Sequence, residues 1–184
     1  MSKLSRHLIA GLSALSVTLA ALPGAAQWVG SGRWDTGNGR FRHVTPGTWM
    51  VLPPRAGQTG VSIHAEGLNR DGRLAISCTT DGARPRMVFD QYFGTNLHRP
   101  VDARDVSAEQ VTLVIDGRSF DGVLAYDIGP RTWSGEAPWD PGFWDAFGWG
   151  NQLDLVNSAG TVVSHFRLRN SGAARGAVRQ YCGL

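Results

Sequence analysis

The chain has 184 residues, a formal net charge of +3 at pH 7 and two cysteines, which is enough chain for one domain with a hydrophobic core. Two of its basic residues, Lys3 and Arg6, lie at the very start, in a segment that has the pattern of a signal peptide. Residues 27–184 alone carry sixteen arginines and fifteen acidic residues, so this part of the chain is nearly neutral. Those arginines are scattered along the sequence. Nucleic-acid binders concentrate basic residues on one face, and lipid-binding segments need about four to eight together, so composition argues against both classes.

The N-terminus has the three-part pattern of a secretory signal peptide. Lys3 and Arg6 supply positive charge, an apolar run follows, and small residues precede an expected cut between Ala26 and Gln27. The run is too short and too rich in serine for a convincing membrane span. The absence of a twin arginine favours the general secretory route. We therefore expect residues 1–26 to be removed, leaving a periplasmic or secreted protein without stable membrane insertion.

The remainder is expected to be one mainly β domain, residues 27–184. Residues 27–58 are rich in Gly, Pro and Trp and predict an irregular N-terminal arm with short strands near 40–44 and 49–52. Beyond it, apolar and polar residues alternate in short runs between turn residues such as Asp-Gly. The runs are VSIHAE, LAISC, MVFDQYF, VTLVI, VLAYD, LDLVN and TVVSHFRL. Short strands of this number, with almost no long helix, predict an antiparallel β-sandwich or open barrel.

An aromatic stretch, APWDPGFWDAFGWGN at residues 137–151, predicts one short helix between the runs VLAYD and LDLVN. Asp140 is placed to cap the helix and Pro141 to occupy its first position. Phe143, Trp144 and Phe147 fall on one helical stripe, at steps of three and four residues. A helix of about two turns has little stability of its own, so we expect this stripe to be buried on the sheet.

The approach to that helix is the candidate ligand-binding segment. Trp133, Glu136, Trp139 and Asp140 are expected to lie in a Gly/Pro/Ser-containing loop, and loops on a β scaffold often carry binding. Tryptophans among acids can stack on sugar rings or anchor a protein partner. They can equally fold back as covers of the core, and that alternative stays open.

A short helix and a disulfide are expected near the C-terminus. Asn170 or Ser171 can cap a helix whose apolar residues recur at three- and four-residue steps, and Gly183 can end it. In an exported chain the even pair Cys78 and Cys182 is expected to form a bridge. A redox or nucleophilic cysteine is the alternative, but the sequence has no C-x-x-C motif and no histidine near either cysteine.

The sequence contains no pattern that predicts a metal site, a cofactor or a catalytic centre. No histidine pair has metal-ligand spacing, and His64 and His165 fall on outward strand faces, where we expect solvent exposure. The Asp-Gly pairs stand alone, as in turns rather than calcium loops. There is no Gly-x-Ser-x-Gly, phosphate loop or dinucleotide motif. Asp140 and Asp145 are a possible carboxylate pair for glycoside hydrolysis, so a hydrolase stays as the least favoured class.

Two blocks carry a resemblance to a known group. LAISC at residues 74–78 and FRLRNSGAA at 166–174, followed by Cys182, resemble blocks found in small exported proteobacterial proteins. The chain resembles the type VI secretion-associated VasI/TagO-like proteins, and more distantly the invasion-associated locus B proteins. The resemblance covers roughly residues 60–182. It implies a periplasmic or secreted β-rich accessory protein and carries over no catalytic residues.

The function expected from these observations is non-catalytic. The leading hypothesis is an exported, disulfide-containing accessory protein that binds a protein partner in the cell envelope, in a role associated with secretion or host interaction. The alternative is recognition of a glycan or peptidoglycan fragment through the Trp133/Trp139 segment. A weak hydrolase is third.

Overall fold

The structure is a computed structural model, which describes residues 33–35, 41–43, 45–52, 60–78, 84–102 and 107–183. The expected signal peptide and its cleavage site at Ala26/Gln27 lie outside the described residues. Much of the expected N-terminal arm does too. The two short strands expected in the arm are present, as β2 (Phe41–His43) and β3 (Met50–Leu52), and β2 pairs with β1 (Arg33–Asp35).

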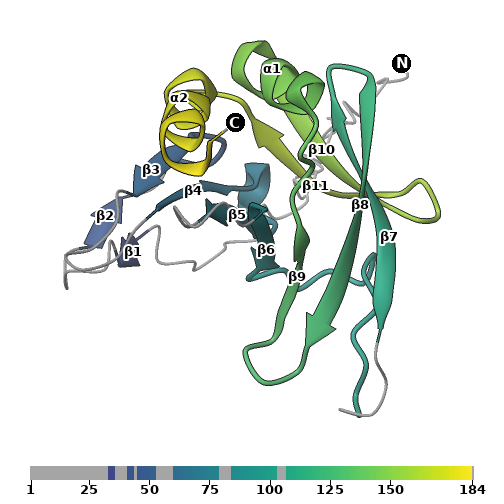
Figure 1. Cartoon of the computed structure of the whole chain (residues 1–184). Coiled ribbons are helices and arrows are strands. Elements are labelled where there is room, and N and C mark those ends of the chain that lie inside the picture. The colour runs from purple at the N-terminus through teal and green to yellow at the C-terminus, as the bar shows by residue number, and fades with distance from the viewer. Residues whose placement is uncertain are drawn as a thin grey trace, which may run out of the picture.

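The described residues confirm a mainly antiparallel β fold. Nine strands form one sheet in the order β11-β10-β7-β8-β9-β6-β5-β4-β3, curled into a half-barrel (Figure 1). After β3 the strands are β4 (Val61–Glu66), β5 (Arg73–Cys78), β6 (Arg86–Asp90), β7 (Ala108–Ile115), β8 (Arg118–Asp127), β9 (Thr132–Glu136), β10 (Gln152–Asn157) and β11 (Val162–Arg167). Of the two predicted architectures, the open barrel is the nearer description. The two ends of the sheet approach each other at a single parallel bridge between Thr48 and Arg169.

Alternating residues of the strands build one hydrophobic core, as the period-two pattern predicts. In β4, for example, Val61, Ile63 and Ala65 are buried. The expected alternation fails in β11, where Val163 and Ser164 are both buried. The register between β10 and β11 shifts at Leu155/Val156, and such a bulge turns successive side chains to the same side.

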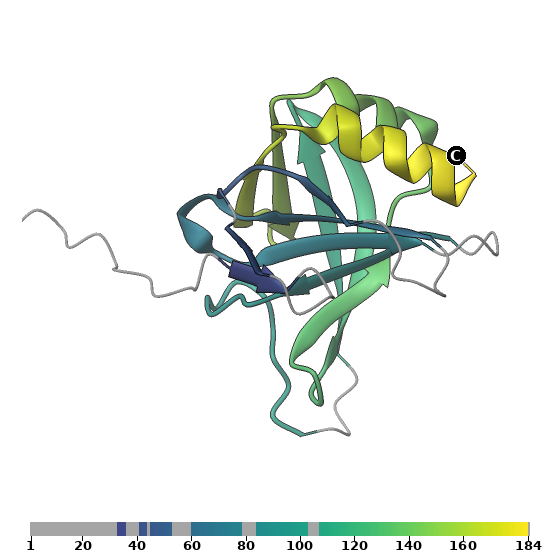
Figure 2. The same ribbon diagram turned by 90° about the vertical axis from the view of Figure 1, so that its left-hand side faces the viewer.

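Two helices lie together over one end of the half-barrel (Figure 2). The first, α1 (Pro141–Trp149), matches the prediction: Asp140 Oδ1 accepts a hydrogen bond from Gly142 N at 2.8 Å. The predicted stripe of Phe143, Trp144 and Phe147 is at most 1% exposed. The stripe therefore closes the core at this end.

The second helix, α2 (Ser171–Cys182), begins differently from the prediction. Asn170 occupies the cap position with φ of 64°, and its amide donates to Trp49 O at 2.8 Å instead of accepting from the helix. Ser171 Oγ donates to Leu168 O, also at 2.8 Å. Asn170 thus contacts the residue before β3 and Ser171 contacts the preceding chain, so neither side chain caps the helix. Gly183, with φ of 70°, ends the helix as expected.

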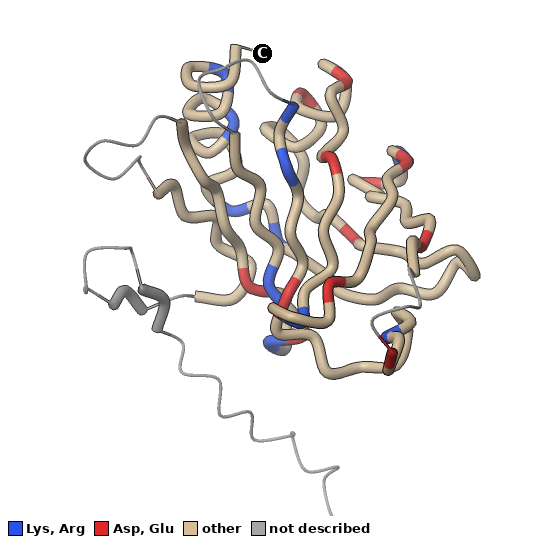
Figure 3. The backbone as a smooth tube through the Cα atoms, turned by 60° about the horizontal axis from the view of Figure 1, so that its bottom comes forward, with Lys and Arg blue, Asp and Glu red and all other residues tan. Residues whose placement is uncertain are grey.

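Charged residues of both signs are interspersed over the described part of the chain (Figure 3). Asp90 and Arg73 pair on neighbouring strands, and Asp154 and His165 do so at the other end of the sheet. The scatter of arginines along the sequence thus remains a scatter in space.

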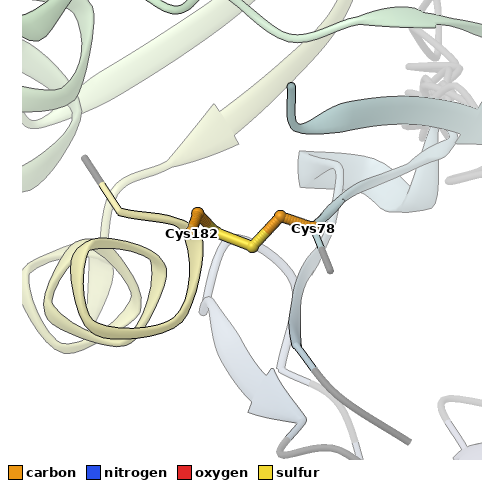
Figure 4. The surroundings of a disulfide bond; sticks show 2 residues. All are labelled: Cys78 and Cys182. Atoms are coloured by element: carbon orange, nitrogen blue, oxygen red, sulfur yellow. A yellow bond between two sulfur atoms is a disulfide. The ribbon is translucent and has the colours of Figure 1, made fainter. Parts of the chain in front are cut away.

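The predicted disulfide between Cys78 and Cys182 is confirmed (Figure 4). The two Cα atoms are 5.7 Å apart and both residues are buried. The bridge ties the last turn of α2 to the end of β5, across 104 residues of sequence.

Candidate functional site

Trp133 does not lie in a loop, as the sequence analysis expected, but in β9. Its side chain is 1% exposed, its ring centroid lies 4.7 Å from that of Tyr126, and Nε1 donates to His98 O at 3.2 Å. A ring buried in this way offers no face to a ligand. The strand escaped prediction because Ser134-Gly135 interrupts its apolar alternation.

The other three predicted residues lie at or near the surface. Glu136 and Trp139 share a cleft of about 540 Å³, the Trp139 cleft, which is also lined by Asp121 and Val123 of the neighbouring strand β8. Trp139 is 36% exposed. Glu136 forms an exposed ion pair with Arg84 at 3.0 Å, a type of contact that contributes at most about 1 kcal/mol. Asp140 is the cap of α1 and lies outside the lining of this cleft.

A second and larger cleft was missed by the sequence analysis. It has a volume of about 660 Å³ and lies between residues 90–101 and the turn that joins β8 to β9. We call it the Arg99 cleft. In Figure 1 that turn lies at the bottom, at the end of the sheet away from α1 and α2. The lining of the Arg99 cleft consists of Asp90, Gln91, Tyr92, Phe93, Arg99, Pro100, Val101, Tyr126, Ile128, Pro130, Arg131 and Thr132.

Arg99 is held against the aromatic floor of this cleft. Its guanidinium carbon lies 5.0 Å from the ring centroid of Trp133 and 5.8 Å from that of Tyr92. One guanidinium nitrogen also donates to Tyr92 O. A guanidinium over aromatic rings is stabilised by the cation–π attraction, so Arg99 is fixed in position. Trp133 does not line the cleft, but it supports Arg99, which does.

The rim of the Arg99 cleft is apolar and open to solvent. Phe93 is 76% exposed and Val101 is 99% exposed. Phe93 belongs to the run MVFDQYF, which was expected to be one strand, but β6 ends at Asp90 and Gln91 turns the chain with φ of 53°. The cleft itself could not be predicted from local sequence, because its lining combines two segments about thirty residues apart.

The histidines divide into one confirmed expectation and one correction. His165 is exposed, and its Nδ1 lies 2.8 Å from Asp154 Oδ1. His64 is half-buried and its Nε2 lies 2.6 Å from Ser62 Oγ, so the expectation of a solvent-exposed side chain is wrong. The two pairs lie on different strands, and among the described residues no hydrogen bond joins them. The serine, histidine and acid of a hydrolytic triad are therefore not assembled there.

The environment of His64 makes the stability of the fold depend on pH. Burial, assisted by the charge of Arg73, lowers the pKa of His64 to about 4. Between pH 6.5 and 4 the unfolded chain binds a proton at this position and the folded protein does not, so acidification favours unfolding by at most about 3 kcal/mol. Burial raises the pKa of Glu66, which acts in the opposite direction over an overlapping range.

The contribution of His64 is therefore measured as a difference. Urea unfolding of the wild type and of His64→Gln at pH 7 and pH 4 should show that the wild type loses more stability on acidification. Loss of the Ser62 contact adds only an offset that is independent of pH. Parallel pH profiles for the two proteins would contradict the expectation.

The described residues show neither a metal-binding cluster nor a membrane-spanning helix. They contain no group of three or more His, Cys, Asp or Glu residues that could hold a metal ion. None of their helices is long and apolar enough to cross a membrane.

The chain was also compared with known proteins. No protein-family model, no curated protein and no solved structure matches it.

Proposed function

We propose that the protein is an exported, non-catalytic accessory protein of the cell envelope that binds a protein partner through the Arg99 cleft. Export is supported by the signal-peptide pattern of the sequence, and the disulfide is compatible with an oxidising compartment. An accessory role agrees with the resemblance to the VasI/TagO-like proteins.

The observation that carries this proposal is the exposed apolar rim of the cleft. Phe93 and Val101 expose most of their apolar surface at the edge of the Arg99 cleft, which has a volume of about 660 Å³. Exposed apolar surface next to polar groups is typical of sites that another molecule covers. Aromatic and arginine side chains, both present here, carry much of the binding energy at protein interfaces.

Site-specific crosslinking in the envelope tests this proposal. A photoreactive benzophenone side chain is placed at Phe93, at Val101 or, as a matched control, at Trp149, which is 80% exposed on α1. We expect light-dependent adducts of defined higher mass from positions 93 and 101 and none from 149. No adduct at any position, or the same adducts at all three, would count against the proposal.

Glycan binding at the Trp139 cleft is the second candidate. The observation in its favour is that Trp139, which is 36% exposed, lines one cleft together with Glu136 and Asp121. Sugar-binding sites combine an aromatic face with polar side chains in this way. Only one ring is offered, since Trp133 is buried. Soluble muropeptides should then shift the fluorescence of the wild type but not of Trp139→Ala. No saturable change at millimolar concentrations would remove this candidate.

A further inference from the structure

We infer that the Arg99 cleft recognises an acidic peptide segment of its partner. In this arrangement one carboxylate lies between Arg99 and Arg131, and a neighbouring apolar side chain packs on Phe93 and Val101. The inference rests on the proposed function, which states only that this cleft binds a protein, and adds the chemistry that is recognised.

The charge of the cleft favours an acid. Arg99, from residues 90–101, and Arg131, from the turn between β8 and β9, both line the cleft, and neither forms an ion pair with any described residue. The carboxylate of Asp90 also lines the cleft, but both of its oxygens accept from Arg73, one from Nε at 2.7 Å and one from a terminal nitrogen. Two arginines therefore line the cleft without a carboxylate partner among the described residues, and guanidinium pairs well with the two oxygens of a carboxylate.

Arg99 is also preorganised for this role. Its guanidinium carbon lies 5.0 and 5.8 Å from the ring centroids of Trp133 and Tyr92, and one of its donors is directed to a backbone carbonyl, that of Tyr92. A long side chain that is already fixed loses little conformational entropy when a ligand binds. The remaining N–H groups of Arg99 are available to an incoming acceptor.

Two residues with left-handed backbone conformation line the same cleft. Gln91 has φ of 53° and Arg131 has φ of 59°, and both line the cleft. The left-handed region is disfavoured for residues other than Gly, Asn and Asp. Such strained positions concentrate at ligand-binding sites, and two of the five described residues other than glycine with positive φ line this cleft.

The openness of the rim favours a peptide segment over a small organic anion. A small ligand is usually enclosed over most of its surface, whereas Phe93 and Val101 project to solvent at 76% and 99% exposure. A chain that crosses the cleft can place its acid at the arginines and its next side chains on this rim. The occupant is therefore expected to be an extended stretch with Asp or Glu beside an aromatic or aliphatic residue.

Selection from a phage-displayed library of random linear dodecapeptides tests the inference. The bait is the oxidised protein purified from the periplasm, and parallel selections use Arg131→Asn and Arg84→Asn. Asparagine tolerates the left-handed conformation of position 131, so the first variant removes the charge without new backbone strain. Arg84 is an exposed arginine of the Trp139 cleft and serves as the matched control.

We expect the wild type and Arg84→Asn to enrich peptides with an acid next to an apolar residue. Arg131→Asn should bind the best of these peptides roughly five to ten times more weakly, as should the wild type toward its Asp→Asn or Glu→Gln counterpart. The two changes combined should weaken binding little more than either alone, because they remove the same contact. High salt should weaken binding of the acidic peptide more than that of its neutral counterpart.

The outcomes separate this inference from the proposed function. Enriched peptides without an acid, or acidic peptides that bind Arg131→Asn as tightly as the wild type, would overturn the inference. If such peptides still lose binding to Phe93→Asp, the proposed function of the cleft stands. If no peptide is enriched over bait-free selection while crosslinks from positions 93 and 101 persist, recognition of a linear acidic segment is refuted and the cleft binds a folded surface.

Discussion

Replacing both cysteines, in Cys78→Ala/Cys182→Ala, should lower the free energy of unfolding by about 4 kcal/mol. The bridge spans 104 residues, and closing a loop of that size restricts the unfolded chain by roughly 4–5 kcal/mol in the chain-entropy account. Domains of this size are stable by only about 5–15 kcal/mol in total. The bridge therefore accounts for a large share of the stability of this fold.

Urea unfolding with and without reductant measures this effect. Reduction should destabilise the wild type by a similar amount and leave the double variant unchanged, which makes the variant its own control. Because the bridge joins the last turn of α2 to β5, amide exchange in α2 should accelerate most. Unfolding midpoints that do not respond to reduction would show that the bridge adds nothing to stability.

Trp133→Ala should destabilise the protein by about 3–5 kcal/mol, the usual effect of truncating a fully buried aromatic side chain. Trp133 is 1% exposed, and its ring contacts those of Phe89, Tyr92 and Tyr126 at centroid distances of 4.7 to 6.1 Å. The matched change Trp139→Ala, at a side chain that is 36% exposed, should alter stability by less than about 1 kcal/mol.

The two tryptophan variants are compared by urea unfolding followed by circular dichroism, which does not depend on the number of tryptophans. Trp133→Leu is a milder second variant, which keeps an apolar side chain in the core but removes the ring beneath Arg99. It should weaken peptide binding to the Arg99 cleft while retaining the fold. Equal stabilities of Trp133→Ala and Trp139→Ala would contradict the assignment of Trp133 to the core.

The comparison of these tryptophans shows where local sequence patterns stop being informative. The stripe of Phe143, Trp144 and Phe147 was predicted to be buried, and it is, because helical spacing places all three on one side whatever they pack against. Trp133 and Trp139 have no such spacing, and their burial depends on which strands pair with β9. The pairing of β9 with β6 and β8 places Trp133 on the core side and leaves Trp139 beyond the strand end.

Local sequence is sufficient to predict the features that depend on short-range periodicity or on simple counting. These are the alternation of the strands, the capped aromatic helix at Asp140 and the pairing of the two cysteines. Tertiary structure alone decided the half-burial of His64, the reassignment of Asn170 from helix cap to donor for Trp49, and the Arg99 cleft. Each depends on contacts between segments distant in sequence, such as Arg99 with Trp133. The alternation of side chains within a strand specifies which residues share a face, but not which other segment covers that face.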